Sequence, residues 1–134
     1  MLHGAGIDVA DVARIARLVE RRGPAFTTRW FAAAEIAQCE RAAVTTAAFA
    51  GVYAAKEAVW KALAIRAWPG PVPWRWICVT ESAPGRWSVR LGGPVADAAQ
   101  AAGVGEVRVH IAQGGAVATA VALATRAVSG APPA

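Results

Sequence analysis

The sequence has few cysteines, few histidines, no long apolar run and almost no lysine. Its cysteines, Cys39 and Cys78, stand alone without the close spacing of a metal site, so we expect two reduced core thiols in a cytoplasmic protein. No apolar run reaches the roughly 18 residues that a membrane-spanning helix needs. The N-terminus also lacks the pattern of a signal peptide. The sequence therefore predicts no membrane association.

Both lysines of the chain lie in one short segment. Lys56 and Lys61 flank Glu57, whereas the other twelve cationic side chains are all arginines. Lysine carries a compact, strongly hydrated point charge, while arginine is a planar fork. A compact cation beside a carboxylate suits the handling of one phosphate oxygen or one proton, so this segment is the first candidate for a functional site.

The net charge narrows the choice of partners. A formal charge of +5 favours an acidic partner: a nucleic acid, an anionic cofactor or an acidic protein. Only the charge supports a nucleic-acid-binding function, because the chain has no motif of the usual nucleic-acid-binding proteins and no clear basic and aromatic surface. We therefore expect no nucleic-acid partner.

The pattern of apolar residues predicts a single α+β domain over residues 1–126, with a frayed tail at 127–134. We expect a mostly antiparallel sheet packed with a long central helix and shorter helices. The first half of the chain predicts a buried strand at 2–10, a helix capped by Asp11 and running to Arg22, a turn at 23–31 and a helix at 33–42. A long alanine-rich helix capped by Thr45 or Thr46 should then reach Ala67.

In the second half of the chain, the spacing of the apolar residues changes from a helical period to that of strands. A rigid break at 69–73 is too short for a domain linker. The expected elements after it are strands at 74–79 and 87–91, a helix at 94–102, and two closing strands around 107–111 and 116–125.

Two acidic residues stand out within these elements. Glu57 and Lys61 share one helix face, and their simplest interpretation is an ordinary surface pair. Asp8 interrupts an apolar strand, either as a strand-end cap, as an edge residue or as part of a site. Brought together, Asp8 and Glu57 would offer two hard oxygen ligands, a set that suits Mg²⁺. Lys56 would lie to one side of this pair, toward a phosphate or toward solvent.

These residues occur in two motifs that resemble a known family. Residues 6–9 with Arg14, followed by residues 49–63, resemble holo-acyl-carrier-protein synthase, the small single-domain branch of the 4′-phosphopantetheinyl transferases. The resemblance covers nearly the whole chain and implies the fold of that family. It further implies a Mg²⁺-dependent transfer of the phosphopantetheine arm from coenzyme A to a serine of an acyl carrier protein, with release of 3′,5′-ADP.

The resemblance also implies residue roles. Asp8 and Glu57 would hold the metal, with Glu57 and Lys61 as catalytic residues and Lys61 at the phosphoryl or leaving group. Lys56, Lys61, Arg66 and His110 are candidates for contact with coenzyme A. Arg14 and Arg21, on the first helix, would meet the acidic carrier protein. Family members form homotrimers with the site between subunits, so a homotrimer is expected here.

The chain departs from the family pattern at three places. Val52 replaces a usual arginine, Ala64 continues the expected helix where a glycine-rich turn is usual, and Ala112 lies in a usually polar run near His110. Arg66, Arg75 or Arg108 could supply the phosphate contacts that are lost. His110 is by default a polar-face strand residue, and a place at the site is the alternative.

The favoured function is therefore a phosphopantetheinyl transferase that acts on a fatty-acid or polyketide carrier. The alternative is a catalytically altered protein of the same fold that binds a carrier domain or a coenzyme-A-like ligand as an interaction module.

Overall fold

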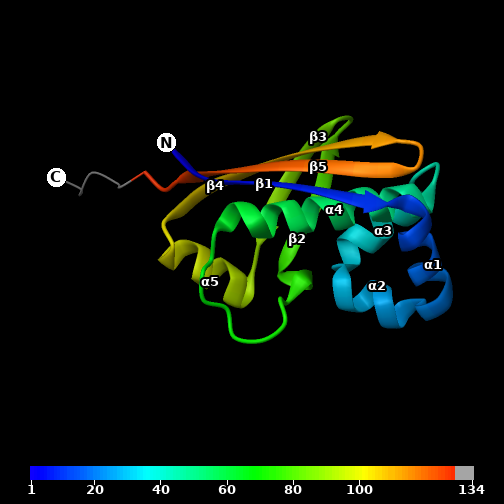
Figure 1. The fold of residues 1–134 in the computed structure, drawn as a ribbon, viewed down its shortest axis with the longest axis horizontal. Coiled ribbons are helices and arrows are strands. Elements are labelled where there is room, and N and C mark those ends of the chain that lie inside the picture. Colours follow the sequence, from blue (N-terminus) through cyan, green and yellow to red (C-terminus); the bar gives the residue numbers. More distant parts are fainter. Residues whose placement is uncertain (129–134) are drawn as a thin grey trace.

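Two antiparallel sheets enclose one long helix in the computed structural model, which describes residues 1–128 (Figure 1). The expected α+β class is confirmed. Most of the expected tail at 127–134 lies outside the described residues. The elements, in chain order, are β1 Leu2–Asp11, α1 Val12–Arg22, α2 Pro24–Trp30, α3 Ala33–Arg41, α4 Thr45–Leu63, the 3₁₀ turn η1 Trp74–Trp76, β2 Ile77–Ala83, β3 Arg86–Leu91, α5 Gly93–Ala101, β4 Val104–Gly114 and β5 Val117–Arg126.

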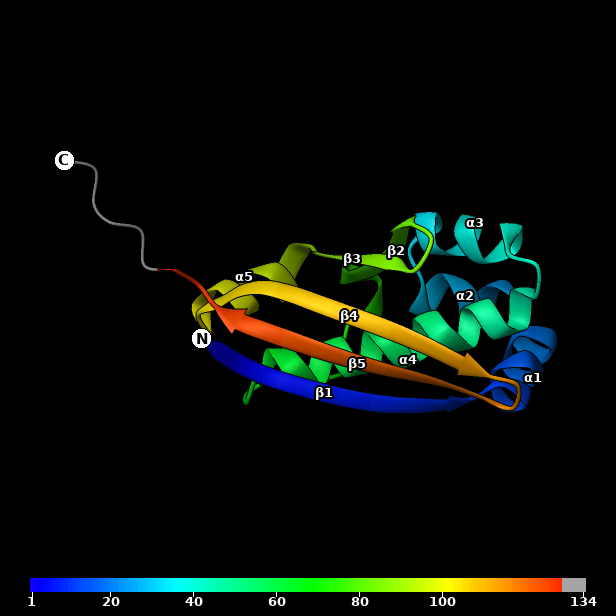
Figure 2. The same ribbon diagram turned by 90° about the horizontal axis from the view of Figure 1, so that it is seen from above.

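The larger sheet joins the two ends of the chain. Its strand order is β1-β5-β4, and both pairings are antiparallel. Figure 2 shows these strands side by side, with α4 running beneath them. The second sheet is the hairpin of β2 and β3. The first strand, β1, packs against the long helix α4, although the two are far apart in the sequence.

Small residues let α4 approach the larger sheet closely. The face of the sheet that β5 turns to the helix carries Ala118, Ala120, Ala122 and Ala124, all fully buried. On β1, a methyl group added to Gly4 or Gly6 would collide with the carbonyl oxygens of Ala62 and Ala58. On α4, an alanine recurs every fourth residue and is always buried, at positions 50, 54, 58 and 62. The backbones of strand and helix are thus in near contact.

The opposite face of this sheet carries its larger apolar side chains. Because side chains alternate along a strand, they belong to the other residues of β1 and β5. They are solvent-exposed in the single chain, namely Ile7, Val9, Val117, Val121 and Leu123. The expectation that residues 2–10 form a buried strand is therefore correct for one face only.

Three expected boundaries were wrong. α4 ends at Leu63 instead of reaching Ala67, because Ala64 adopts the left-handed conformation (φ 52°) in which a helix stops. Pro24 opens a short helix, α2, where a turn was expected. Trp74 to Trp76 form a 3₁₀ turn, so the strand begins only at Ile77. By contrast, Asp11 caps α1 as expected, with its Oδ1 accepting from the amide of Arg14.

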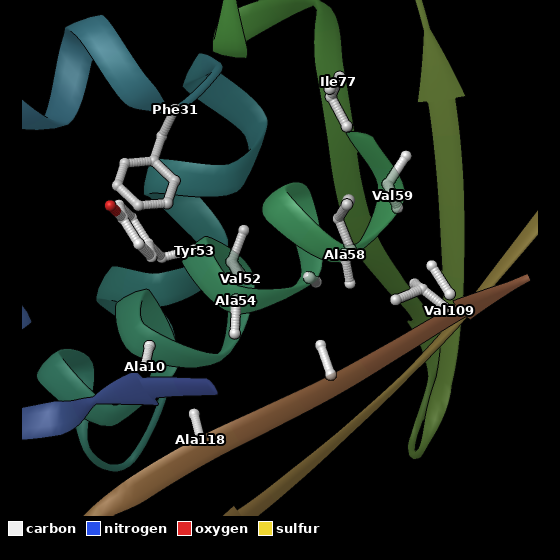
Figure 3. Packing of buried hydrophobic residues seen from close by; sticks show 14 of the residues in the cluster. Ala10, Phe31, Val52, Tyr53, Ala54, Ala58, Val59, Ile77, Val109 and Ala118 are labelled. Carbon is white, nitrogen blue, oxygen red and sulfur yellow. The ribbon is translucent and has the colours of Figure 1, made fainter. Parts of the chain in front are cut away.

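The core lies on both sides of α4. Figure 3 shows Ala54 directed toward Ala118 of β5, while Phe31 and Ile77 lie on the far side of the helix. Cys39 and Cys78 are both buried and unpaired, as expected. Within residues 1–128, no helix combines the length and the apolar character that crossing a membrane would require.

Candidate functional site

The site is assembled where β1 and α4 lie in near contact. Asp8 follows Gly4 and Gly6 on the helix-facing side of β1, and its carboxylate is therefore presented to α4. Lys61 Nζ donates to Asp8 Oδ1 at 2.9 Å and to the carbonyl of Ile7 at 3.0 Å. The lysine side chain remains 52% exposed, whereas that of Asp8 is 15% exposed. Asp8, which was expected to lie near Glu57, is thus paired with Lys61, four residues further along the same helix.

Glu57 lies beside Asp8, on the same face of α4 as Lys61. Its pKa is raised from 4.5 to about 7, first because burial disfavours the charged form and then because Asp8 hydrogen-bonds to it and repels its charge. Tyr53 and Lys61 act in the opposite direction. A carboxyl group whose charged form is disfavoured is therefore held beside a second carboxyl group and one ammonium.

Tyr53 connects this pair to the first helix. Burial first, and then the neighbouring carboxylate of Glu57, raise the pKa of its hydroxyl to about 12, while Arg14 acts in the opposite direction. The ring is held against Trp30, with ring centroids 4.3 Å apart. Arg14 itself is exposed on α1, as is Arg21. The arginine face of α1 therefore borders the carboxylates, a relationship that the sequence did not predict.

The donor set fits a divalent cation of the Mg²⁺ type. A metal ion held by Asp8 and Glu57 would offset the burial and the repulsion by Asp8 that raise the pKa of Glu57. Among the described residues, no group of three or more His, Cys, Asp or Glu side chains could hold a metal. Two protein carboxylates with water and substrate phosphates completing the shell are the usual arrangement for Mg²⁺.

Lys56 lies elsewhere, and its expected position toward a phosphate or solvent was wrong. It is fully buried, and its Nζ donates to Glu35 Oε1 at 2.6 Å and to the carbonyl of Ile77 at 2.5 Å. Burial lowers the pKa of Lys56, and Glu35 opposes that shift. Sequence reasoning also missed Glu35, whose available signal was its place as the third residue of a helix, where it accepts from the amide of the capping residue Ala32.

The other residues that were expected to contact coenzyme A do not bind to the Asp8–Glu57 pair within the single chain. Arg66 is exposed in the segment that follows α4, and no hydrogen bond or ion pair joins its side chain to the pair. His110 is exposed on the outer face of the larger sheet, opposite Val121. Arg75 and Arg108 are exposed as well, and Arg108 pairs with Glu106 at 3.0 Å.

A separate cleft of about 720 Å³ opens between the start of α4, the β2–β3 hairpin and β4. Gln113 reaches across it, since its Nε2 donates to the carbonyl of Ala47 at 2.6 Å. The cleft contains Val52, one of the departures from the family pattern, and adjoins Ala112, another. Its wall also includes Arg41, Glu81, Trp87 and Ile111.

The sequence of this chain is similar to those of one known protein family. A family described as the 4′-phosphopantetheinyl transferase superfamily matches residues 4–122. The chain is 39% identical over 120 residues to the holo-[acyl-carrier-protein] synthase of Clavibacter sepedonicus, covering 90% of this chain and 92% of the relative. It is 38% identical over 127 residues to the enzyme of the same name from Anaeromyxobacter dehalogenans, with 92% and 95% covered.

Solved structures of synthases with the same name have a similar fold. The holo-[acyl-carrier-protein] synthase of Neisseria meningitidis superposes with a TM-score of 0.83 at 26% identity, covering 94% of this chain and all of the other. The synthase–coenzyme A complex of Chronobacterium ammoniagenes superposes with a TM-score of 0.77 at 30% identity, covering 92% and 96%. The similarity therefore extends over nearly the full length in both sequence and fold.

Proposed function

The chain belongs to the holo-[acyl-carrier-protein] synthases of the 4′-phosphopantetheinyl transferase superfamily, and we propose that it transfers the phosphopantetheine arm of coenzyme A to a serine of an acyl carrier protein. The proposal includes Mg²⁺ dependence and release of 3′,5′-ADP. The observation that carries it is the cluster of Asp8, Glu57 and Lys61, in which two carboxylates and one exposed ammonium meet.

Asp8 and Glu57 would hold the metal ion together with the pyrophosphate of coenzyme A. When bound, Mg²⁺ supplies neutralisation of the charge that develops on the transferring phosphoryl group. Glu57 would then be fully ionised, because a cation favours its charged form. Tyr53 keeps the carboxylate oriented through its hydroxyl, and the packing of Tyr53 on Trp30 restrains that hydroxyl in turn.

Lys61 is placed to act on the leaving group. Its ammonium is bound to Asp8 but half exposed, so it can turn to a phosphate oxygen while the metal ion would pair with the largely buried Asp8. The carrier serine oxygen would bond to the phosphorus that carries the pantetheine arm. The bond from that phosphorus to the bridging oxygen breaks, 3′,5′-ADP departs, and the hydroxyl proton is released to water. Lys61 stabilises the negative charge on the departing phosphate.

We propose the cleft beside Val52 as the place where the nucleotide end of coenzyme A binds. Arg41 offers a cation in its wall, and Trp87 and Ile111 offer apolar surface. The Chronobacterium structure is a complex with coenzyme A, at 30% identity to this chain, which supports coenzyme A as the donor. Gln113 would supply a polar contact in the run where Ala112 departs from the family pattern.

The carrier protein would dock on α1. Arg14 and Arg21 are exposed there together with Arg17 and Arg22. Complementary charge of this kind accelerates and orients the encounter with an acidic partner. Arg14 also touches Tyr53, so a carrier bound along α1 would lie next to the carboxylate pair.

The outer face of the larger sheet supports the proposed homotrimer. Ile7 is 61% exposed, Val9 57% and Leu123 47% on that face. A contiguous apolar face of this kind marks an interaction surface, and copies of this chain would cover it. His110 lies on the same face and would then be brought into the subunit contact. The two unpaired thiols agree with the cytoplasmic location that we propose for this enzyme.

The test is a direct transfer assay. The protein is mixed with coenzyme A, Mg²⁺ and an apo carrier protein, and the carrier is weighed by mass spectrometry. We expect the carrier to gain the mass of the phosphopantetheine arm and 3′,5′-ADP to accumulate in equal amount, with both lost in EDTA. Folded protein that leaves several acidic carriers unmodified, yet binds them, would instead support the interaction-module alternative.

A further inference from the structure

The buried ion pair of Glu35 and Lys56 has no part in the transfer reaction as proposed above. Both side chains are fully buried, with Nζ and Oε1 2.6 Å apart. Removing two charges from water is costly, and buried ion pairs can often be replaced by apolar residues without loss of stability. Stability alone is therefore a weak reason for its presence, and a role in specifying structure is the better explanation.

The pair is anchored to three other parts of the backbone. Glu35 Oε1 also accepts from the amide of Ala32, and Glu35 Oε2 accepts from the amide of Val79, each at 2.8 Å. Lys56 Nζ donates in addition to the carbonyl of Ile77. Since hydrogen bonds are directional, these contacts fix where Lys56 can lie relative to α3 and β2.

The opposite side of α4 fixes its rotation less firmly, because its polar contact with β1 is made by the half-exposed side chain of Lys61. There the helix presents Ala54, Ala58 and Ala62 to the glycines of β1 and the alanines of β5. Small side chains allow close approach but form shallow ridges, and the angle of a packed helix is set by ridges that fit into grooves. This contact therefore sets the distance between α4 and the sheet better than it sets the rotation of the helix.

Rotation matters because Glu57 follows Lys56 directly. Successive residues are about 100° apart around a helix, so Lys56 points toward α3 and β2 while Glu57 points toward β1. A carboxylate about 6 Å from the helix axis moves by ~1 Å when the helix turns by about 10°. Catalytic groups must be held within about 0.5 Å of productive geometry.

We propose that the Glu35–Lys56 ion pair is a positioning device for the reaction: it fixes the rotation of α4 and so aims Glu57 at Asp8. The proposal rests on the proposed function of the Asp8–Glu57 pair. Lys56 then acts through its neighbour without touching a substrate, which explains a fully buried lysine one residue away from a carboxylate of the site.

The test compares two variants of the same helix. The double variant Glu35→Gln with Lys56→Met removes both charges while keeping the volume and one acceptor oxygen, which can serve the amide of Ala32 or that of Val79. Val59→Ala is the matched control, because it removes buried volume from α4 but leaves the ion pair intact. Both are assayed at a temperature at which near-ultraviolet circular dichroism shows each to be folded.

We expect kcat of the double variant to fall by about 10- to 100-fold, with KM for the carrier protein changed by less than about threefold because α1 is untouched. The control should lose less than about threefold in kcat. Equal kcat losses in the two variants would overturn the proposal. If the double variant does not fold, Glu35→Gln alone serves in the same comparison, with an expected loss of at least about fivefold.

A second readout separates this proposal from the proposed function. Binding of Mn²⁺ to the free protein, followed by electron paramagnetic resonance, should weaken at least about fivefold in the double variant but not in the control. If the wild-type protein transfers nothing, the proposed function fails and the Mn²⁺ comparison decides alone. An unchanged Mn²⁺ titration in the double variant would overturn the positioning role.

Discussion

Lys61 donates a hydrogen bond to Asp8 at 2.9 Å across a gap of 53 positions in the sequence. The contact joins the first strand of the chain to its longest helix, directly beside Glu57. Each residue is unremarkable alone, since a strand aspartate and a helical Glu–Lys pair are common surface features. Their meeting point defines the site, and it depends on Gly4 and Gly6 letting the helix come close.

Glu57→Gln should abolish transfer. The substitution removes one of the two carboxylates proposed to hold Mg²⁺ while keeping size and hydrogen-bonding capacity. We expect a loss of at least about 10³-fold in kcat/KM, measured by mass spectrometry of the carrier. Glu40→Gln, an exposed change on α3, is the control and should retain full activity. Retained activity in Glu57→Gln would show that the site is misassigned.

Stability without metal should fall as pH rises from about 4.5 to about 7. Glu57 has a pKa of about 7 in the folded protein and 4.5 as its ordinary value, so the folded state binds more protons over this interval. The effect should amount to about 1 kcal/mol after allowance for the partial exposure of Glu57. Urea unfolding in EDTA at pH 5 and pH 8 measures it. Parallel pH dependence in Glu57→Gln and wild type would contradict the assignment.

Removing arginines from α1 should weaken encounter with the carrier more than chemistry. For Arg21→Ala we expect KM for the carrier to rise by about 10-fold and kcat to change by less than about twofold, with a smaller difference in high salt. Arg14→Ala should also lower kcat, because Arg14 contacts Tyr53. Steady-state kinetics with apo carrier checks both. Arg126→Ala, at the end of β5, is the control, and an equal rise in its KM would argue against a specific α1 surface.

A charge on the outer face of the larger sheet should dissociate the proposed trimer. Val121 lies between Ile7 and His110 in the register of that sheet. We expect Val121→Glu to sediment as a monomer with an unchanged circular dichroism spectrum, because burying an unpaired carboxylate in an interface is costly. Val44→Glu places the same charge on an exposed valine away from the sheet and should leave assembly intact. A monomeric wild-type protein at micromolar concentration would refute the trimer.

Gly6→Ala should damage both fold and activity. The added methyl group would collide with the carbonyl of Ala58 and come within 2.8 Å of Lys61 Cβ. We expect a loss of about 2 kcal/mol in the free energy of unfolding and reduced transfer, since strand and helix must separate. Gly114→Ala, whose methyl group would meet nothing within 4 Å, is the matched control. Equal stability of the two variants would disprove close packing at Gly6.

The elements with strong local signals were predictable from the sequence. Asp11 capping α1 and the alternation around Val109 both depend on neighbouring residues. The long helix was also predicted, although it starts at Thr45 after Val44 and no threonine side chain caps it. The proximity of Asp8 to Glu57 was proposed from the types of the two residues and from the resemblance to a family. Periodicity alone could not bring a strand and a helix together over such a separation.

The features that were missed depend on tertiary contacts. Glu35 and Lys56 carry charges, and charge in a sequence normally indicates solvent exposure; only their mutual distance shows that they are buried together. The helix end at Ala64 has no glycine to mark it, so the alanine-rich pattern appeared to continue. On β5 the larger side chains face outward, because the alanines are needed where α4 approaches.

The two cysteines give the chain an internal reporter. Cys39 lies on α3 and Cys78 on β2, and both are buried near the Glu35–Lys56 pair. Burial raises the pKa of Cys39 to about 12, and the pKa of Cys78 is raised as well, so neither thiol ionises readily in the folded protein. Alkylating reagents act on the thiolate. Labelling should therefore be slow until the chain opens, so a thiol probe can time the opening of this half of the core without an engineered label.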